Sequence, residues 1–585
     1  MKIRKKLLFL LTPLALCLSS CDILPALSTG YIEIHCSNGG SIKTLAEEFE
    51  EYSTGIEIVL YPKANDGYKL TSLTVNGVDI LDSESFKLQS DLNYVDAKFT
   101  LIDDIDEEYN YTLSSDRLLI EDVYNAQGLP VLPSLGTVKA LVVPINFSDQ
   151  IAFDDNDLKA IDVAFNGEYS DKTNSYWESV ASYYKKSSYN KLDLSFTICD
   201  AITSPITSTE FSRRESSEDA AGVKVILDYI YNKLTLENND INLKNYDVNK
   251  DGYVDGLWLI YNVDDVYEVY NRNNFWAYTY WNISDTATPN VNKPQFGVYA
   301  NCANIFLYQD SSLGYDAHTL IHETGHMFGL DDYYTYDDKI NVSSLGGLDM
   351  MDLNIGDHNA FSKIILGWVD PKIINVKNSS VVLNSFAETG ECLLISNSFE
   401  DSPFNEYYLV EFYTNTNLNY LDSTHNYGEE FYTTPYNRLY DYEGVKILHV
   451  DARLLKYLDF NEYYINNGTI KDLPSFPKYY PVYTIATSNT ASYSYKYDDE
   501  GRYNLIEIVT PSNQRTYGST FLGTDKKGNE ELRGLFLEGE SFSSSTQSNF
   551  FINNKLHNGS SFDYKIEVQS IQDHQATIVI KWLRF

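Results

Sequence analysis

The chain has 585 residues, and its 83 acidic residues against 44 basic ones give a formal net charge of −39 at pH 7. Such a surface repels nucleic acid, which we exclude as a partner, and it favours cations and solubility. The length exceeds what one hydrophobic core usually organises, so we expect about two to four domains.

The N-terminus has the pattern of a bacterial export signal. Basic residues at positions 2, 4, 5 and 6 precede an apolar run over residues 7–18, which is too short to span a bilayer. Residues 18–21 (LSSC) then resemble the cleavage box of bacterial lipoproteins. We predict that residues 1–21 are a signal peptide with its lipobox, and that a lipid on Cys21 anchors the chain at the extracellular face of the membrane. Secretion after an ordinary signal peptide is the alternative.

Residues 31–102 are predicted to form a small β module, because short alternating runs are separated there by Gly and Asn turns. Its segments GGSIK, GYKLTSLTVNG and YVDAKF resemble one repeat of the internalin B type. That resemblance implies a spacer or an adhesin. An acidic run follows, and residues 103–134 are predicted to be a linker or a prosegment.

Cysteines are few and far apart once Cys17 is removed with the signal and Cys21 is lipidated. The spacing contains no CxxC pair and argues against a thiolate zinc site. Disulfides are allowed outside the cell, free buried thiols are the alternative, and the sequence does not choose between them for Cys36, Cys199, Cys302 and Cys392.

The remaining chain divides into two predicted domains. A strand-like segment at 137–147 and helix-like segments at 176–186 and 220–232 predict an α/β domain over residues 135–371. Alternating runs beyond it predict a β-sandwich over residues 372–585. The 49 tyrosines either serve protein or glycan binding or fill ordinary strand positions.

Oxygen-bearing residues alternate over positions 247–255. Together with Gly252 at the sixth position, they match the first half of a calcium-binding loop. Trp258 stands at the twelfth position, where a full EF-hand has Glu. An acidic turn without metal is the alternative. We predict a structural calcium ion bound by Asp247, Asn249, Asp251, the carbonyl of Tyr253, and Asp255.

The segment HETGH at 322–326 carries the strongest chemical signal. On a helix, residues four apart share one face, so His322 and His326 can present two nitrogens to one zinc ion. Gly329 allows a sharp turn that brings Asp332 back as the third ligand, with Asp331 or a carboxylate from a distant segment as the alternatives. This spacing matches the longer metzincin signature with Asp in place of its last His.

Glu323 stands beside these ligands without being one. We predict that it takes a proton from the attacking water and passes it to the leaving amine. Tyr333 or Tyr334 is a candidate oxyanion donor, and either one can equally be a core residue.

Met350 and Met351 stand where metzincin-like folds place a methionine turn beneath the metal, and ordinary core packing is the alternative. For His358, we favour a structural role over substrate or oxyanion binding.

Further segments resemble the immune inhibitor A type of secreted bacterial metallopeptidase, in the family's order. These are 137–149 (TVKALVVPINFSD), 179–194 (SVASYYKKSSYNKLDL), 246–256 (YDVNKDGYVDG), 274–278 (NFWAY), the zinc motif with the two following tyrosines, 346–352 (GGLDMMD), 362–371 (SKIILGWVDP), 406–412 (EYYLVEF) and 444–451 (GVKILHVD). The resemblance implies a secreted zinc endopeptidase stabilised by calcium.

The sequence therefore predicts a multidomain α+β protein with an N-terminal β module, an α/β zincin catalytic domain of metzincin type and a C-terminal β-sandwich. We expect a monomeric, lipid-anchored enzyme that hydrolyses extracellular proteins or peptides with one catalytic zinc and at least one structural calcium. The alternative is a non-catalytic surface lipoprotein, an adhesin or glycan binder, on a peptidase-derived scaffold; such relatives usually lose the Glu or a His, and both are present here. A metal-storage lipoprotein would need a His-rich tract, and the nine histidines form none.

Overall fold

The computed structural model describes most of the chain from residue 29 onward. The described residues are 29–36, 40–44, 51–65, 68–81, 83, 85–89, 91–101, 113, 117–167, 177–218, 220–235, 241–263, 274–282, 289–307, 315–334, 344–374, 378–397, 402–424, 438–458, 461–464, 482–484, 504–516, 522–523 and 532–583. The predicted signal peptide and Cys21 lie outside these ranges, as does the acidic run at 103–108. The chain forms two compact units, Met1–Asp103 and Asp104–Phe585.

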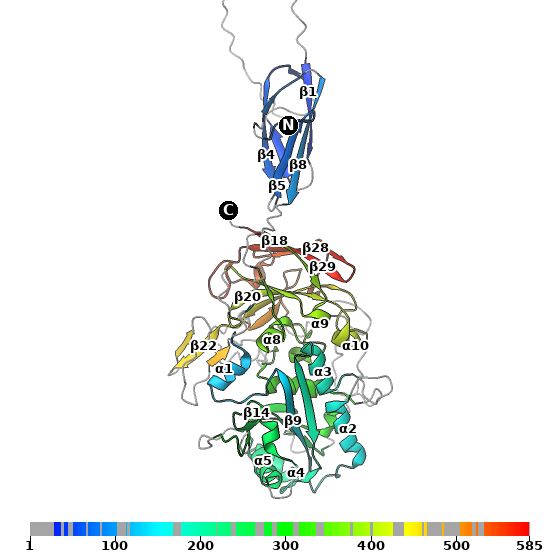
Figure 1. The fold of residues 1–585 in the computed structure, drawn as a ribbon, viewed down its shortest axis with the longest axis vertical. Coiled ribbons are helices and arrows are strands. Elements are labelled where there is room, and N and C mark those ends of the chain that lie inside the picture. Colours follow the sequence, from blue (N-terminus) through cyan, green and yellow to red (C-terminus); the bar gives the residue numbers. More distant parts are fainter. Residues whose placement is uncertain are drawn as a thin grey trace, which may run out of the picture. The chain divides into compact units, whose positions relative to one another are not determined.

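The first unit contains two small β-sheets (Figure 1). Its strands are β1 (Thr29–Cys36), β2 (Gly40–Thr44), β3 (Tyr52–Ser53), β4 (Glu57–Ala64), β5 (Tyr68–Val75), β6 (Val78–Asp79), β7 (Ser85–Lys87) and β8 (Asp91–Leu101). One sheet has the order β3-β1-β8-β5-β6 and the other the order β2-β4-β7. Because side chains alternate along a strand, β4 places Ile58 and Leu60 in a core that also holds Ile32, Leu73 and Val95 of the larger sheet.

A mostly parallel sheet organises the first half of the second unit. It consists of β9 (Gly136–Asn146), β10 (Leu192–Ile198), β11 (Ile202–Thr203), β13 (Leu257–Tyr261), β14 (Tyr278–Trp281) and β16 (Val298–Ala303). The order is β10-β9-β13-β16-β14, with β11 paired to β9, and only β14 runs antiparallel to its neighbour. All residues of β13 are buried, as expected for a central strand covered on both faces.

Helices precede, connect and follow these strands along the chain. They are α1 (Ile120–Ala126), α2 (Asp155–Asn166), α3 (Val180–Ser187), α4 (Ser208–Glu215), α5 (Ala221–Leu234), α6 (His318–Met327), α7 (Met350–Leu353) and α8 (Ala360–Ile365). The helices α2 and α3 pack against β10, whereas α6 packs against β14 and β16. Two further short strands, β12 (Tyr253–Val254) and β15 (Gln295–Phe296), pair beside the sheet. No helix among the described residues is both long and apolar enough to cross a membrane.

Two sheets dominate the second half of this unit. Their strands, with two short helices, are β17 (Lys372–Ile374), β18 (Asn378–Asn384), α9 (Phe386–Thr389), β19 (Cys392–Ile395), β20 (Glu406–Tyr413), α10 (Tyr420–Thr424), β21 (Gly444–Asp451), β25 (Ile506–Ile508), β26 (Leu535–Phe536), β27 (Ser541–Ser543), β28 (Tyr564–Gln572) and β29 (Gln575–Trp582). The orders are β17-β19-β20-β21-β25 and β18-β29-β28-β27. A separate small sheet joins β22 (Leu454–Leu458), β23 (Asn461–Tyr464) and β24 (Val482–Thr484).

The mixed α+β organisation expected from the sequence is confirmed. Both large C-terminal sheets contribute to one apolar core, which includes Tyr408, Val445 and Ile578. The largest core, however, contains residues on both sides of the predicted boundary at residue 371, from Leu113 to Leu535. The α/β half and the sheet of β20 and β21 are therefore packed as one body. The cysteines among the described residues are free thiols, and Cys199, Cys302 and Cys392 are buried.

Candidate metal centre

The helix α6 carries the candidate site because it is buried on nearly every side. Leu320, Ile321 and Met327 are fully covered, which fixes the helix against the sheet and leaves its histidines facing one place. Gly329 ends the helix with φ +93°, a conformation that glycine adopts without strain. A Cβ there would also lie 2.9 Å from Tyr124 Cε2 of α1, so the position requires glycine for two reasons.

Three side chains converge on one point beyond this helix. The Nε2 atoms of His322 and His326 lie 2.9 and 3.1 Å from Oδ1 of Asp332, and 3.1 Å from each other. Asp332, and not its rival Asp331, is brought to the two histidines. The turn at Gly329 produces this return of the chain.

The second nitrogen of each imidazole fixes its tautomer. Nδ1–H of His322 donates to the carbonyl of Met350 at 2.8 Å, and Nδ1–H of His326 donates to that of Leu330 at 2.7 Å. Since a carbonyl only accepts, each neutral ring keeps its Nε2 lone pair directed at the carboxylate of Asp332. Acceptors in such contact need a shared proton or a metal cation between them.

The electrostatics of the group agree with that requirement. Burial opposes charge on His326, but Asp332 outweighs burial and raises the pKa of His326 to about 10. Burial likewise opposes ionisation of Asp332, and the two histidines nevertheless hold the pKa of its carboxyl below the usual range. Two imidazoles and one carboxylate are the donor set of a catalytic zinc site, so the residues present fit that ion.

Glu323 lies beside the group without joining it. Its side chain is almost fully buried, and burial raises its pKa, while the nearby histidines lower it. The hydroxyl of Thr279, on the edge strand β14, lies 3.1 Å from Oε2 and 2.8 Å from the carbonyl oxygen of Glu323. Thr279 was not predicted from the sequence, because its position on a distant strand follows no motif spacing.

The two methionines pack under α6, where the sequence predicts a methionine turn. Met350 supplies the carbonyl that orients His322, and both side chains are fully buried. A Cβ on Gly325 would lie 2.5 Å from Sδ of Met351. Gly325 thus allows the methionine to lie directly against the helix.

The two candidate tyrosines differ in position. The hydroxyl of Tyr333 is buried and hydrogen-bonds to that of Ser362 at 2.7 Å, so Tyr333 belongs to the core. The hydroxyl of Tyr334 instead hydrogen-bonds to Asp332, and burial, followed by the charges of Asp332 and Glu323, raises its pKa. Of the two tyrosines, Tyr334 is the one that reaches the candidate metal ligands.

His358 is surrounded by the aromatic rings of Tyr183, Tyr184 and Trp368, and it is close enough to His322 to feel its charge. It is 1% exposed, and burial lowers its pKa. Both ring nitrogens of His358 are buried without a hydrogen-bond partner among the described residues, so the hydrogen-bonded structural role that the sequence favours is not seen.

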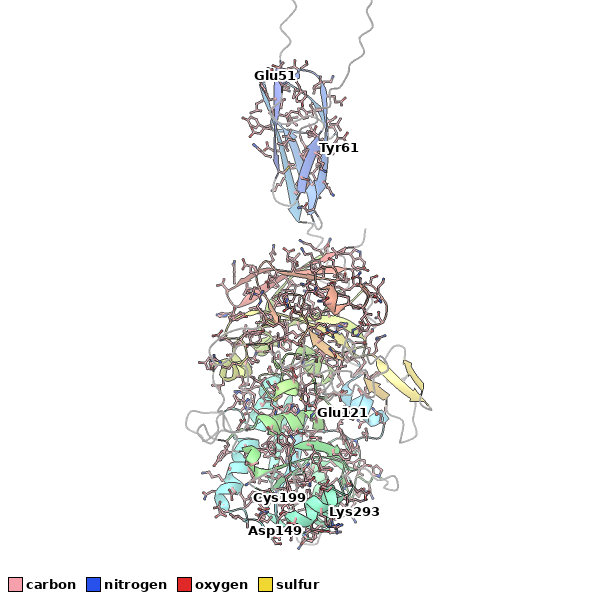
Figure 2. All side chains as sticks on the ribbon, turned by 180° about the vertical axis from the view of Figure 1, so that it is seen from behind. Glu51, Tyr61, Glu121, Asp149, Cys199 and Lys293 are labelled. Atoms are coloured by element: carbon pink, nitrogen blue, oxygen red, sulfur yellow. The ribbon has the colours of Figure 1, made fainter. Side chains whose placement is uncertain are left out.

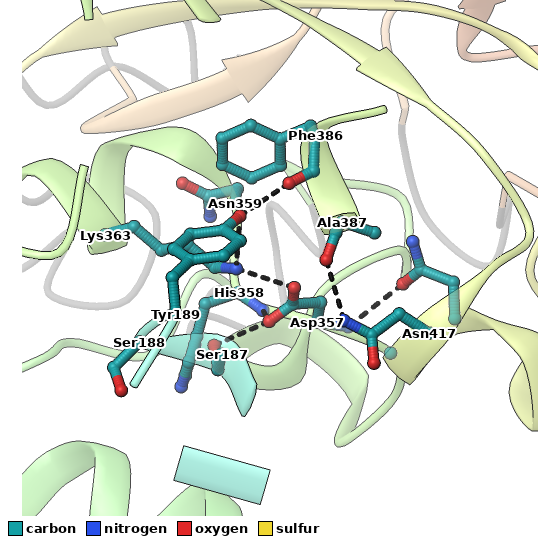
Figure 3. A network of polar contacts seen from close by, with 12 residues as sticks. Ser187, Ser188, Tyr189, Asp357, His358, Asn359, Lys363, Phe386, Ala387 and Asn417 are labelled. Carbon is teal, nitrogen blue, oxygen red and sulfur yellow. Dashed lines mark hydrogen bonds and ion pairs between the residues drawn. The ribbon is translucent and has the colours of Figure 1, made fainter. Parts of the chain in front are cut away.

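A polar network adjoins His358 (Figure 3). Asp357 accepts a hydrogen bond from Ser187 at 2.6 Å and pairs with the fully buried ammonium of Lys363 at 2.6 Å. Lys363 also donates to the hydroxyl of Tyr189 at 3.0 Å and lies over the ring of Phe386. This network ties α3 and α8 to Phe386 of the short helix α9.

The predicted calcium loop forms a compact turn with uncompensated charge. Backbone amides donate to Asp247, Asn249, Asp251 and Asp255. However, Oδ1 of Asp247 and Oδ1 of Asp255 are buried without a hydrogen-bond partner. Burial raises the pKa of Asp255 to about 8. Orphaned carboxylate oxygens of this kind fit a hard cation such as calcium.

Glu121 of α1, labelled in Figure 2, contacts the same loop. Its carboxylate hydrogen-bonds to Asn249, and burial followed by the charge of Asp122 raises its pKa. Glu121 thus offers the loop a carboxylate in place of the Glu of a full EF-hand, whose position Trp258 occupies here. Nothing in the sequence spacing links it to the loop, because it comes from the segment predicted to be a linker or prosegment.

Comparisons with protein-family models and with curated proteins found no match to this chain.

Proposed function

We propose that the protein is a zinc-dependent endopeptidase of metzincin type, related to the immune inhibitor A family, that cleaves extracellular proteins. The convergence of two imidazole Nε2 atoms and the Asp332 carboxylate beside the buried Glu323 is the observation that carries this proposal. When bound, zinc supplies the Lewis acidity that polarises the scissile carbonyl and lowers the pKa of water.

Glu323 is the general base in this scheme. Burial raises its pKa above the ordinary value, which makes the carboxylate a stronger base toward water, and the acid that forms can return the proton to the leaving amine. Thr279 holds the carboxylate in place through its hydroxyl. Tyr334 donates to the oxyanion of the tetrahedral species, as its position at Asp332 supports.

The edge strand β14 is the site at which an extended substrate binds. It pairs with β16 on one side, and no described strand pairs with its other side. A peptide can add to such an edge through backbone hydrogen bonds. Because Thr279 belongs to β14, the added peptide would pass directly beside Glu323.

The remaining assignments are part of the same proposal. Calcium at the loop 247–255 is structural, because its ligands fix a loop rather than perform chemistry. Residues 1–21 direct export, Cys21 carries a lipid anchor, and the first unit holds the enzyme away from the membrane.

The test is hydrolysis of unfolded casein by the chain from residue 22 onward, compared with Glu323→Gln and with Glu218→Gln, which changes an exposed glutamate. We expect cleavage by the parent and by Glu218→Gln, and none by Glu323→Gln, with zinc bound in all three. Cleavage retained in Glu323→Gln would refute the role of Glu323. Absence of zinc from the parent would refute the enzyme and leave the adhesin.

A further inference from the structure

A second group of potential metal ligands lies between the two large C-terminal sheets. Glu406 begins β20, His449 lies in β21, and His557 lies in the loop between β27 and β28. All three are buried, and one ligand atom from each lies within 4.8 Å of the others.

Strand register explains how two of them meet. Glu406 is opposite Asp451, and Tyr408 is opposite His449, so these four side chains share one face of the sheet. On that face, the ring of Tyr408 stacks on the ring of His449, with centroids 4.9 Å apart. Nε2 of His449 lies 2.9 Å from Oε1 of Glu406. The loop from the second sheet then brings His557 over the pair, with the two imidazole centroids 4.6 Å apart.

We propose that Glu406, His449 and His557 bind a second metal ion, of the zinc class, that fastens the loop 551–563 to β20 and β21. Two imidazole nitrogens and one carboxylate oxygen suit zinc, whereas calcium prefers oxygen ligands alone. The chain thus holds two histidine–carboxylate metal sites, and only the first stands beside a general base.

The groups around the ligands support this proposal. Nδ1 of His557 lies 3.0 Å from Oδ2 of Asp451, and Arg453 holds that carboxylate through two bonds of 2.7 and 2.8 Å. With its proton on Nδ1, His557 has its lone pair on Nε2. A carboxylate behind a ligating histidine is the usual support of a zinc site.

Neighbouring groups also hold the side chain of Glu406 in position. Backbone amides of His557 and Asn558 donate to its two oxygens at 2.6 and 2.7 Å, which fixes the orientation of the carboxylate. Glu507 also faces His449 across the strands, but it is engaged by Arg515. Arg453 lies 3.8 Å from Oε2 of Glu406, beyond hydrogen-bond distance, and Oε1 of Glu406 is the carboxylate oxygen that contacts His449.

The arrangement indicates a structural ion. His449 and Glu406 are almost completely buried. The two further acids beside the group, Asp451 and Glu507, are each bound by an arginine and are not free to act as a base. A closed site of this kind stabilises the fold and does not turn over a substrate. Without metal, the same contacts amount to a buried histidine–glutamate ion pair, which is the competing explanation.

The experiment uses the chain from residue 22 onward with His322→Gln and His326→Gln, which disables the first site and leaves the second intact. Excess calcium occupies the loop 247–255, and bound zinc is measured after chelation, reloading and gel filtration. We expect about one zinc per chain and a higher midpoint of thermal unfolding when zinc is present. A further His557→Gln or Glu406→Gln change should abolish both effects.

Cobalt(II) absorption of the His322→Gln, His326→Gln variant gives a second readout that needs no change in the second site. Tetrahedral cobalt bands support the proposal. No bound zinc and no such bands would overturn it and leave the ion pair. Because peptide hydrolysis is not measured, failure here is distinct from failure of the proposed peptidase.

Discussion

Replacing Thr279 by Val tests how the proposed base is tuned. The hydroxyl of Thr279 lies 3.1 Å from Oε2 of Glu323, and this contact lowers the pKa of a carboxyl that burial raises. A hydrogen bond to a charged group is worth about 1.5–3 kcal/mol, and we take the lower value because the hydroxyl is shared with a carbonyl. At about 1.4 kcal/mol per pKa unit, the pKa of Glu323 should rise by about one unit.

The sign of the effect follows from the role of the base. Glu323 must be ionised to accept a proton, so activity is lost as the pH falls through its pKa. A higher pKa therefore moves the acidic limb of kcat/KM for a quenched peptide to higher pH by about one unit, with zinc still bound.

Thr324→Val is the matched control. It also removes a buried hydroxyl from the same region, but that hydroxyl donates to the carbonyl of Leu320 at 2.7 Å rather than to Glu323. Its acidic limb should not move. An unchanged limb in Thr279→Val, or an equal shift in both variants, would refute the reasoning.

Three other changes have defined outcomes. Tyr334→Phe should lower kcat about 100-fold with zinc retained, as loss of one oxyanion donor does, whereas an unchanged kcat would remove Tyr334 from the mechanism. Gly329→Ala should lower the unfolding free energy by about 1–2 kcal/mol for the left-handed backbone and by about 1–3 kcal/mol more for the contact with Tyr124. Gly539 has φ +83° and open space around it, so Gly539→Ala should show only the backbone loss in a urea titration. Equal losses in the two variants would contradict the contact with Tyr124. Folding raises the pKa of Asp255 to about 8, so the calcium-free folded protein binds more protons than the unfolded chain and should lose stability as the pH rises from about 4 to about 8. Melting curves should show this loss of stability in chelator and not in calcium. A stability difference between the two conditions that does not change with pH would argue against the calcium site.

Local spacing accounts for what the sequence could predict of the candidate site. His322 and His326 share a helix face, and Asp332 follows a turn that only Gly329 permits, so short-range geometry determines their meeting. Met350 and Met351 of α7 follow the histidine motif closely in sequence, so the same local reasoning applies to them. The expected helix at 220–232 corresponds to α5 for the same reason, because its apolar period is local.

Tertiary packing decides the rest. Thr279 reaches Glu323 because β14 is added to the sheet beyond β16, and Glu121 reaches the loop at Asn249 because α1 packs there. Glu406 and His557 meet only when two sheets close on each other. No period or motif in one sequence encodes these approaches. The domain boundary at residue 371 was predicted from the change in hydrophobic pattern along the sequence, whereas the largest apolar core includes residues on both sides of it.

The central claim is tested most directly by comparing Asp332→Ala with Asp331→Ala, in the chain from residue 22 onward with His557→Gln, for casein cleavage and bound zinc in the same preparation. We predict that Asp332→Ala loses both the zinc and the cleavage, while the neighbouring Asp331→Ala keeps about one zinc per chain and its activity. Zinc and cleavage that persist in Asp332→Ala would contradict the account.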